Sequence, residues 1–140
     1  GGNPAGAGSA VTISMTDTLL GGTVSHAFPK APGTLTRSSV GASVSRGAPL
    51  TITTSGGVAG TLTLVTINQT NDDGQTTLIC EFPAESPSVS IPASLLAYFH
   101  DGAFNLLVDT RVQSFAVANG YDVALVYANS TLPQQSSFTP

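Results

Sequence analysis

The chain has 140 residues, a formal net charge of −4, 41% hydrophobic residues and only 9% charged residues. This length fits one domain that can bury a sizeable core. The four basic residues are scattered through the sequence and form no positive patch for nucleic acid or an anionic membrane, so we expect neither as a partner. No apolar run approaches the ~18 residues of a membrane span.

The chain begins Gly1-Gly2-Asn3-Pro4, with no initiator Met. This start indicates a processed mature chain or an excised fragment, which is consistent with export, and we expect a secreted, extracellular or cell-surface protein. Residues 1–9 are small and have no periodicity, so they predict a flexible or extended leader. Residues 10–140 are expected to form a single domain.

The first patterned segment runs from residue 10 to residue 15. Val11, Ile13 and Met15 alternate with polar residues and share one face, which predicts a half-buried strand. A turn at 20–23 and a short extended piece to Phe28 follow. Pro29, Pro32 and Gly33 then predict a loop.

Residues 35–45 are weakly patterned, and residues 50–54 read as a further strand. The segments 61–67 and 76–82 are rich in β-branched and aliphatic residues and flank the polar stretch Asn71-Asp72-Asp73-Gly74. Two such runs around an Asp-Gly turn predict a β-hairpin. Because the first run is apolar on both faces, we expect it to be an inner strand.

Residues 92–99 are the one helical candidate, with Pro92 suited to the first turn and Gly102 to the stop. A strand is predicted over 104–108. Segments 112–118 and 121–127 predict a second hairpin, because Asn119-Gly120 is a strong signal for a two-residue turn. The tail, residues 132–140, begins with Leu132 and is then polar except for Phe138 and its prolines.

About eight short strands with frequent turn signals and one helical turn predict an all-β, antiparallel two-sheet sandwich. The block 49–129 resembles the Ig-like β-sandwich domains of secreted bacterial proteins. The resemblance is carried by the stretches Leu50–Thr53, Leu78–Ala84, Ile91–Leu96 and Asn119–Val123. It implies a role in adhesion, display or surface architecture, with Tyr121 as a corner tyrosine. The chain has no Trp and one Cys, so the Cys–Trp–Cys signature of antibody-type domains is missing.

Cys80 is the only cysteine, so the chain has no intrachain disulfide and no cysteine-based metal cluster. It alternates with Leu78 and Phe82, which predicts a buried thiol that packs as a small hydrophobic group. A reactive nucleophile and an interchain disulfide are the alternatives.

Catalytic signals are weak. His26 and His100 have no metal-ligand spacing, and the pair His100-Asp101 is interpreted as a polar loop rather than as a base with its orienting carboxylate. No Gly-x-Ser-x-Gly elbow is present. We therefore expect a protein that is not an enzyme and has no cofactor.

The acidic residues allow one metal hypothesis. Asn71-Asp72-Asp73-Gly74 faintly resembles a calcium loop but lacks the distal Glu, so a solvated hairpin turn is preferred and no metal site is predicted. Asp101, Asp109 and Asp122 could still meet in space.

Two sequons, at Asn68 and Asn129, are candidate glycosylation sites, and both are expected beside turns. Phe82, Phe104, Phe115, Tyr121 and Tyr127 are assigned to the core by alternation, which leaves Tyr98 and Phe99 as candidates for stacking on a sugar. A secreted carbohydrate- or ligand-binding module, which takes a glycan or a cell-surface ligand, is accordingly the alternative function.

The leading hypothesis is a non-catalytic structural or adhesive subunit that associates with other copies of itself, into a filament or another surface assembly. Val11, Ile13 and Met15 provide alternating anchors behind a flexible leader, as a strand added to a neighbour's sheet edge requires. The alternative is that this strand pairs within its own domain. Low charge removes one common defence against edge-to-edge association.

Overall fold

The computed structural model describes residues 6–140, so the predicted leader lies partly outside the described residues. The all-β prediction is confirmed for the part described, which has eleven strands and one short helix. In chain order they are β1 (Val11–Asp17), β2 (Gly22–Phe28), β3 (Thr36–Arg37), β4 (Ser43–Ser45), β5 (Leu50–Ser55), β6 (Leu62–Asn71), β7 (Gly74–Pro83), β8 (Ser88–Ile91), α1 (Ala93–Leu96), β9 (Gly102–Ala118), β10 (Tyr121–Ser130) and β11 (Gln134–Thr139).

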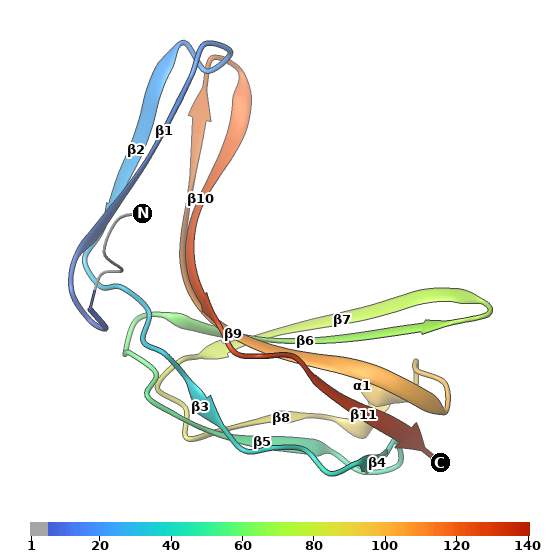
Figure 1. Cartoon of the computed structure of the whole chain (residues 1–140). Coiled ribbons are helices and arrows are strands. Elements are labelled where there is room, and N and C mark those ends of the chain that lie inside the picture. The colour runs from blue at the N-terminus through green and yellow to red at the C-terminus, as the bar shows by residue number, and fades with distance from the viewer. Residues whose placement is uncertain (1–5) are drawn as a thin grey trace.

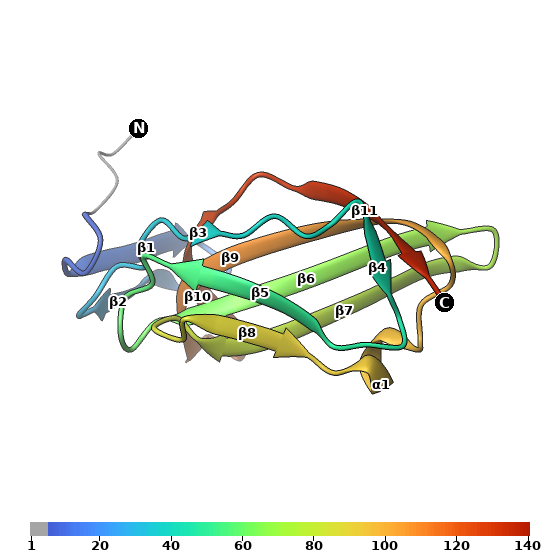
Figure 2. The same cartoon turned by 90° about the horizontal axis from the view of Figure 1, so that it is seen from below.

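Most of the chain forms a base of two sheets packed face to face (Figure 2). The larger sheet has the order β4-β11-β9-β6-β7, with β10 also paired to β9, and the smaller one has the order β3-β5-β8. Fully buried side chains from both sheets fill the space between them, among them Ile52 and Ile91 from the smaller sheet and Val65, Leu106 and Val108 from the larger. Apolar burial of this kind is the main stabilising contribution to the base.

The central hairpin is confirmed. β6 and β7 pair antiparallel, and the pair Asn71↔Gly74 closes the turn. The side chain of Asn71 accepts a hydrogen bond from the backbone N–H of Asp73 at 3.0 Å, which stabilises the turn locally. β6 also pairs with β9, so it is the inner strand that its two apolar faces predict.

β9 corrects one expectation. The sequence predicts separate strands over 104–108 and 112–118, but the structure has a single strand of 17 residues. The polar residues Asp109, Thr110 and Arg111 do not interrupt it, because β6 pairs with them on one side and β10 on the other. Tertiary pairing has overridden local sequence preference here.

The second half of β9 and most of β10 leave the base and rise from it, which makes the molecule L-shaped (Figure 1). We define the arm as residues 11–28 together with residues 112–127. The β1–β2 hairpin is a separate two-stranded sheet that packs against the β9–β10 hairpin, with β2 on β9 and β1 on β10. An isolated two-stranded hairpin is marginal in water, so each hairpin stabilises the other.

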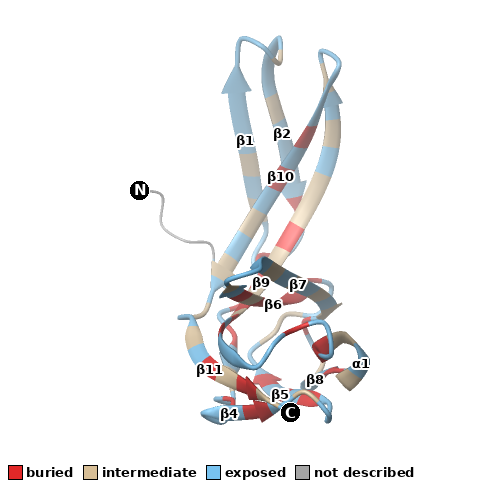
Figure 3. Ribbon diagram, turned by 90° about the vertical axis from the view of Figure 1, so that its right-hand side faces the viewer, coloured by how far each residue is buried: buried red, intermediate tan, exposed pale blue. Residues whose placement is uncertain are grey.

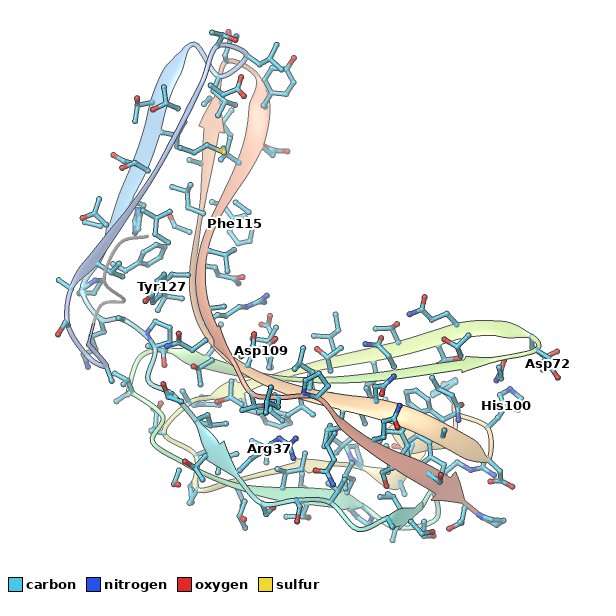
Figure 4. The ribbon with its side chains drawn as sticks, in the orientation of Figure 1. Arg37, Asp72, His100, Asp109, Phe115 and Tyr127 are labelled. Atoms are coloured by element: carbon cyan, nitrogen blue, oxygen red, sulfur yellow. The ribbon has the colours of Figure 1, made fainter. Side chains whose placement is uncertain are left out.

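The contact between the two hairpins has its own small core. Val123 and Leu125 of β10 are buried, and Figure 3 shows buried positions in the arm as well as in the base. Tyr127 points from the same strand toward the β1–β2 hairpin (Figure 4). Residues at alternate positions of β9 and β10, including Phe115, point to the opposite side, which faces the inside of the L.

Three further expectations are modified. The helix is shorter than predicted, with Pro92 as its N-cap residue and only Ala93–Leu96 in helical conformation. The stretch 35–45 contains only the short strands β3 and β4. The tail forms β11, which lies between β4 and β9. No helix of the described chain is long and apolar enough to cross a membrane.

Candidate interaction site on the arm

The N-terminal strand pairs within its own chain. Val11, Ile13 and Met15 lie in β1, and Ile13 is opposite His26 of β2 in an unbroken antiparallel register. In the single chain the candidate donor strand pairs with β2, and its pairing with a neighbouring copy stays a prediction. Val11 and Ile13 are half-buried and Met15 is exposed. Within the described residues, the other edge of β1 has no strand beside it.

The turn of the β9–β10 hairpin is as predicted. Asn119 and Gly120 have φ values of 50° and 80°, and two consecutive positive φ values define the type I′ turn that suits a two-residue hairpin loop. The side chain of Asn119 also donates a hydrogen bond from Nδ2 to the carbonyl oxygen of Leu19 at 2.8 Å. This bond joins the tips of the two hairpins.

An apolar surface lies on the inner face of the arm. Phe115 and Val117 of β9 are 73% and 75% exposed, and Val126 of β10 is 45% exposed. The assignment of Phe115 and Tyr121 to the core is therefore wrong. Phe115 and Val117 lie on the exposed face of β9, whereas the small residues Ser114 and Ala116 lie on its other face and are half-buried.

Tyr121 is 51% exposed and lies directly after the turn at the tip of the arm. The tip is the end of the arm away from the two-sheet base, so Tyr121 does not lie at a corner of that base. Together with Met15, Leu19, Leu20 and Val123 it lines a hollow of about 320 Å³ between the hairpin tips. Sequence reasoning missed this hollow because it depends on how two hairpins distant in sequence pack together.

The strand edges of the arm carry little charge. β6 pairs with β9 only as far as Arg111, so residues 112–118 have β10 on one side and no strand from residues 6–140 on the other. The segments 11–16, 22–28, 112–118 and 123–127 contain no Asp, Glu, Lys, Arg or Pro. Lysine, proline and bulges are the devices that normally protect edge strands from pairing with other chains.

The histidines do not form a catalytic arrangement. The exposed His100 is held through its backbone, which pairs with the buried side-chain amide of Gln69 by two hydrogen bonds of 2.9 Å. The carboxylate of Asp101 binds Arg46 at 2.6 Å rather than orienting an imidazole. His26 is exposed on β2, and its ring lies 4.6 Å from the ring of Phe28.

The acidic residues lie apart. Asp101 precedes β9, Asp109 lies at the bend where β9 leaves the base (Figure 4), and Asp122 is at the tip of the arm. The turn residues Asp72 and Asp73 are exposed. In the described residues no three His, Cys, Asp or Glu side chains come together as metal ligands.

Both sequons lie inside strands, which corrects the expectation that they flank turns. Asn68 is in β6, where its Oδ1 accepts a hydrogen bond from Thr77 at 2.7 Å. Asn129 is in β10, and its Nδ2 donates to the carbonyl oxygen of Pro32 at 2.8 Å. Since Nδ2 is the atom that would carry a glycan, a glycan on Asn129 would replace a hydrogen bond at the bend.

The remaining candidates divide between core and surface. Phe99 is buried and packs against Phe138 with ring centroids 5.1 Å apart, whereas Tyr98 is 75% exposed. Cys80 is half-buried, packs against the core of the base, and has its thiol pKa raised by burial. Burial disfavours the thiolate, which is the reactive form of cysteine.

No protein-family model, curated protein or solved structure matches this chain. The resemblance to Ig-like domains therefore stays a prediction.

Proposed function

We propose that this protein is a non-catalytic, extracellular structural or adhesive subunit that associates with copies of itself through its arm. The observation that carries the proposal is the arm itself, a two-layered projection whose strand edges carry charge only at the tip and have no partner strand in the described chain. Projecting edges of this kind are templates for strand addition from another chain.

The arm has two sides on which edges are open. Because β1 packs on β10 and β2 packs on β9, the free edges of β1 and β10 lie on one side and those of β2 and β9 on the other. The proposed addition of strands through the N-terminal strand β1 takes place on the side that holds the free edges of β1 and β10. β1 keeps its pairing with β2, and its outer edge receives the edge of a neighbouring arm. Main-chain hydrogen bonds supply affinity in such a contact, and alternating side chains supply register.

Charged residues on the arm are confined to its tip. Asp17 ends β1 and Asp122 is the second residue of β10, so neither lies in the middle of an edge. Only these two acidic groups oppose the approach of a second arm, and exposed charges are screened by physiological salt. We expect association to strengthen moderately when salt is raised.

The experiment is sedimentation velocity of the full chain over a hundredfold range of concentration, with electron microscopy of the concentrated sample. The proposal predicts growth of dimers and larger assemblies with concentration. The double variant Thr12→Lys/Ser14→Lys adds charge to two exposed positions of β1 and should weaken association at that edge.

The matched control is Thr51→Lys/Thr53→Lys, which adds the same charge to exposed positions of β5, a strand of the base that pairs with β8 at both positions. This control should associate as the native chain does. A native chain that stays monomeric at every concentration would contradict the proposed function.

Sugar binding is the second candidate, and the exposed ring of Tyr98 favours it. Aromatic rings are the usual stacking platforms for sugars, but Tyr98 follows α1 on the base whereas Phe115 lies on the arm, so the two rings do not form one platform. Binding of the native chain to a glycan array, abolished by Tyr98→Ala, would support this alternative.

A further inference from the structure

A second interaction edge lies on the opposite side of the arm from β1. In the base, β6 occupies one side of β9 up to the pair Leu62↔Arg111, and beyond it no strand of the described chain covers that side of residues 112–118. The open stretch reads Val-Gln-Ser-Phe-Ala-Val-Ala. It contains the β-favouring residues Val112, Phe115 and Val117 and has no charge, no Pro and no Gly, which are features of segments that pair with identical copies.

The backbone of this stretch has a defined orientation. The carbonyl oxygen of Val108 accepts a hydrogen bond from the N–H of Thr131 at 3.0 Å, so Val108 directs its backbone groups toward the side where β10 and β11 lie. These groups alternate between the two sides along a strand, and the pairing of β9 with β10 runs without a bulge from Asp109 to Ala118. Gln113, Phe115 and Val117 therefore direct their N–H and C=O groups to the open side.

We propose that residues 112–118 pair antiparallel with the same residues of a second copy, about a two-fold axis at Phe115. The inference rests on the proposed self-association and names its partner and its register. Antiparallel pairing of a strand with itself is self-complementary, as a two-fold interface requires. In this register Phe115 lies opposite Phe115 of the second copy, and Gln113 lies opposite Val117.

The length of the open stretch fits this register. Residue 112 pairs with residue 118 of the second copy, so the turn of the second copy comes to the point where β6 begins beside β9. The whole stretch that β6 leaves open is then used. The exposed Phe115 side chains come together as a cross-strand aromatic pair, which is among the favourable pairs in a sheet.

The second layer of the arm adds to the same contact. The free edge of β2 lies on the same side as the open edge of β9, and the residues from Gly22 to Phe28 include no Asp, Glu, Lys, Arg or Pro. The interface therefore joins two two-layered arms. Combined with an independent contact at the β1 edge, a two-fold contact here links copies into an open chain, because each copy then has two different interfaces.

The test uses charge complementation at the two-fold position in the full-length protein. Phe115→Lys and Phe115→Glu each place like charges opposite one another, and each alone should weaken dimerisation at least tenfold in sedimentation equilibrium. Mixed in equal amounts, the two variants should form a 1:1 heterodimer, because opposite charges then meet. Position 115 is exposed, so neither variant should disturb the fold, which far-ultraviolet circular dichroism checks.

The matched control is Val126→Lys, which places the same charge on the same face of the arm but on β10. It should dimerise as the native chain does. The inference is overturned if Phe115→Lys dimerises as the native chain does, or if Val126→Lys weakens dimerisation as much as Phe115→Lys. It is also overturned if the mixture of Phe115→Lys and Phe115→Glu forms no heterodimer. If the native chain associates and Phe115→Lys associates equally well, this pairing alone is contradicted. If the native chain never associates, the proposed function is contradicted as well.

Discussion

Thr110 and Asn129 are cross-strand neighbours on β9 and β10, and their side chains donate hydrogen bonds to two consecutive backbone carbonyls, those of Gly33 and Pro32. The distances are 2.6 and 2.8 Å. The segment 31–33 that receives these bonds is buried and connects the β1–β2 hairpin to the base. This pair of residues therefore fixes the second layer of the arm at the bend where the arm leaves the base.

The first prediction tests that fixation. Thr110→Val keeps the shape of a fully buried side chain but leaves the carbonyl oxygen of Gly33 without its donor. An unsatisfied buried acceptor costs about 1–3 kcal/mol, so we expect the free energy of unfolding, measured in urea, to fall by that amount. The matched control is Thr63→Val. The Oγ1 of Thr63 is buried and has no hydrogen-bond partner, so this variant should be neutral or more stable. Equal losses in the two variants would contradict this account.

The second prediction concerns the tips of the two hairpins. Asn119→Gly keeps the positive φ that the turn requires but removes the hydrogen bond to Leu19. We expect amide hydrogen exchange to accelerate in residues 17–22, where the β1–β2 hairpin loses its link to β10, with little change in the base. Because opening at a hairpin tip is local, the urea midpoint should move little. Unchanged exchange at 17–22 would show that the bond does not hold the tip.

Local sequence signals predicted the turns of this fold well. Asn119-Gly120 predicts a two-residue turn because both positions need positive φ. The stretch from Asn71 to Gly74 predicts a second turn because Gly74 supplies a positive φ there. The inner position of β6 also follows from the sequence, because the neighbouring apolar residues Leu64 and Val65 lie on opposite faces of the strand and both are buried.

The arm could not be predicted in the same way. Alternation divides β9 into two faces but does not say which face another hairpin will cover, and at Phe115 the larger residue is on the exposed side. The pairing of β11 with β9 joins residues distant in sequence, and the polar tail gave no sign of it apart from Phe138, which stacks on Phe104 with ring centroids 4.1 Å apart. The candidate site depends on these long-range arrangements, so its residues were only partly identified.

The third prediction concerns a close approach in the base. A Cβ added to Gly57 would lie 1.7 Å from the carbonyl oxygen of Ala84, a backbone atom that can move only with its chain. We expect Gly57→Ala to lower the free energy of unfolding by about 3 kcal/mol, the upper end of the range typical of overpacking. Gly47→Ala is the control, since its Cβ would meet only the side-chain oxygen of Ser45 at 3.5 Å. The two variants should differ clearly in thermal midpoint.

The fourth prediction concerns the Cys80 thiol. Burial raises its pKa, so iodoacetamide should alkylate the folded protein more slowly than the urea-unfolded protein at pH 8, and the rate should rise only at higher pH. The same shift has a consequence for stability. A thiol with a raised pKa in the folded state stabilises the fold below the pKa of the unfolded chain, and this contribution is lost as pH rises through the folded-state pKa.

The control for this effect is Cys80→Ser, which removes the titrating thiol. The native chain should lose stability on the alkaline side more steeply than the variant does, with both measured in urea between pH 7 and pH 10. The difference should be small, because Cys80 is only half-buried and solvent screens much of the burial effect. Alkylation of the folded chain as fast as that of the unfolded chain would contradict this account, because burial would then not slow the reaction of the thiol.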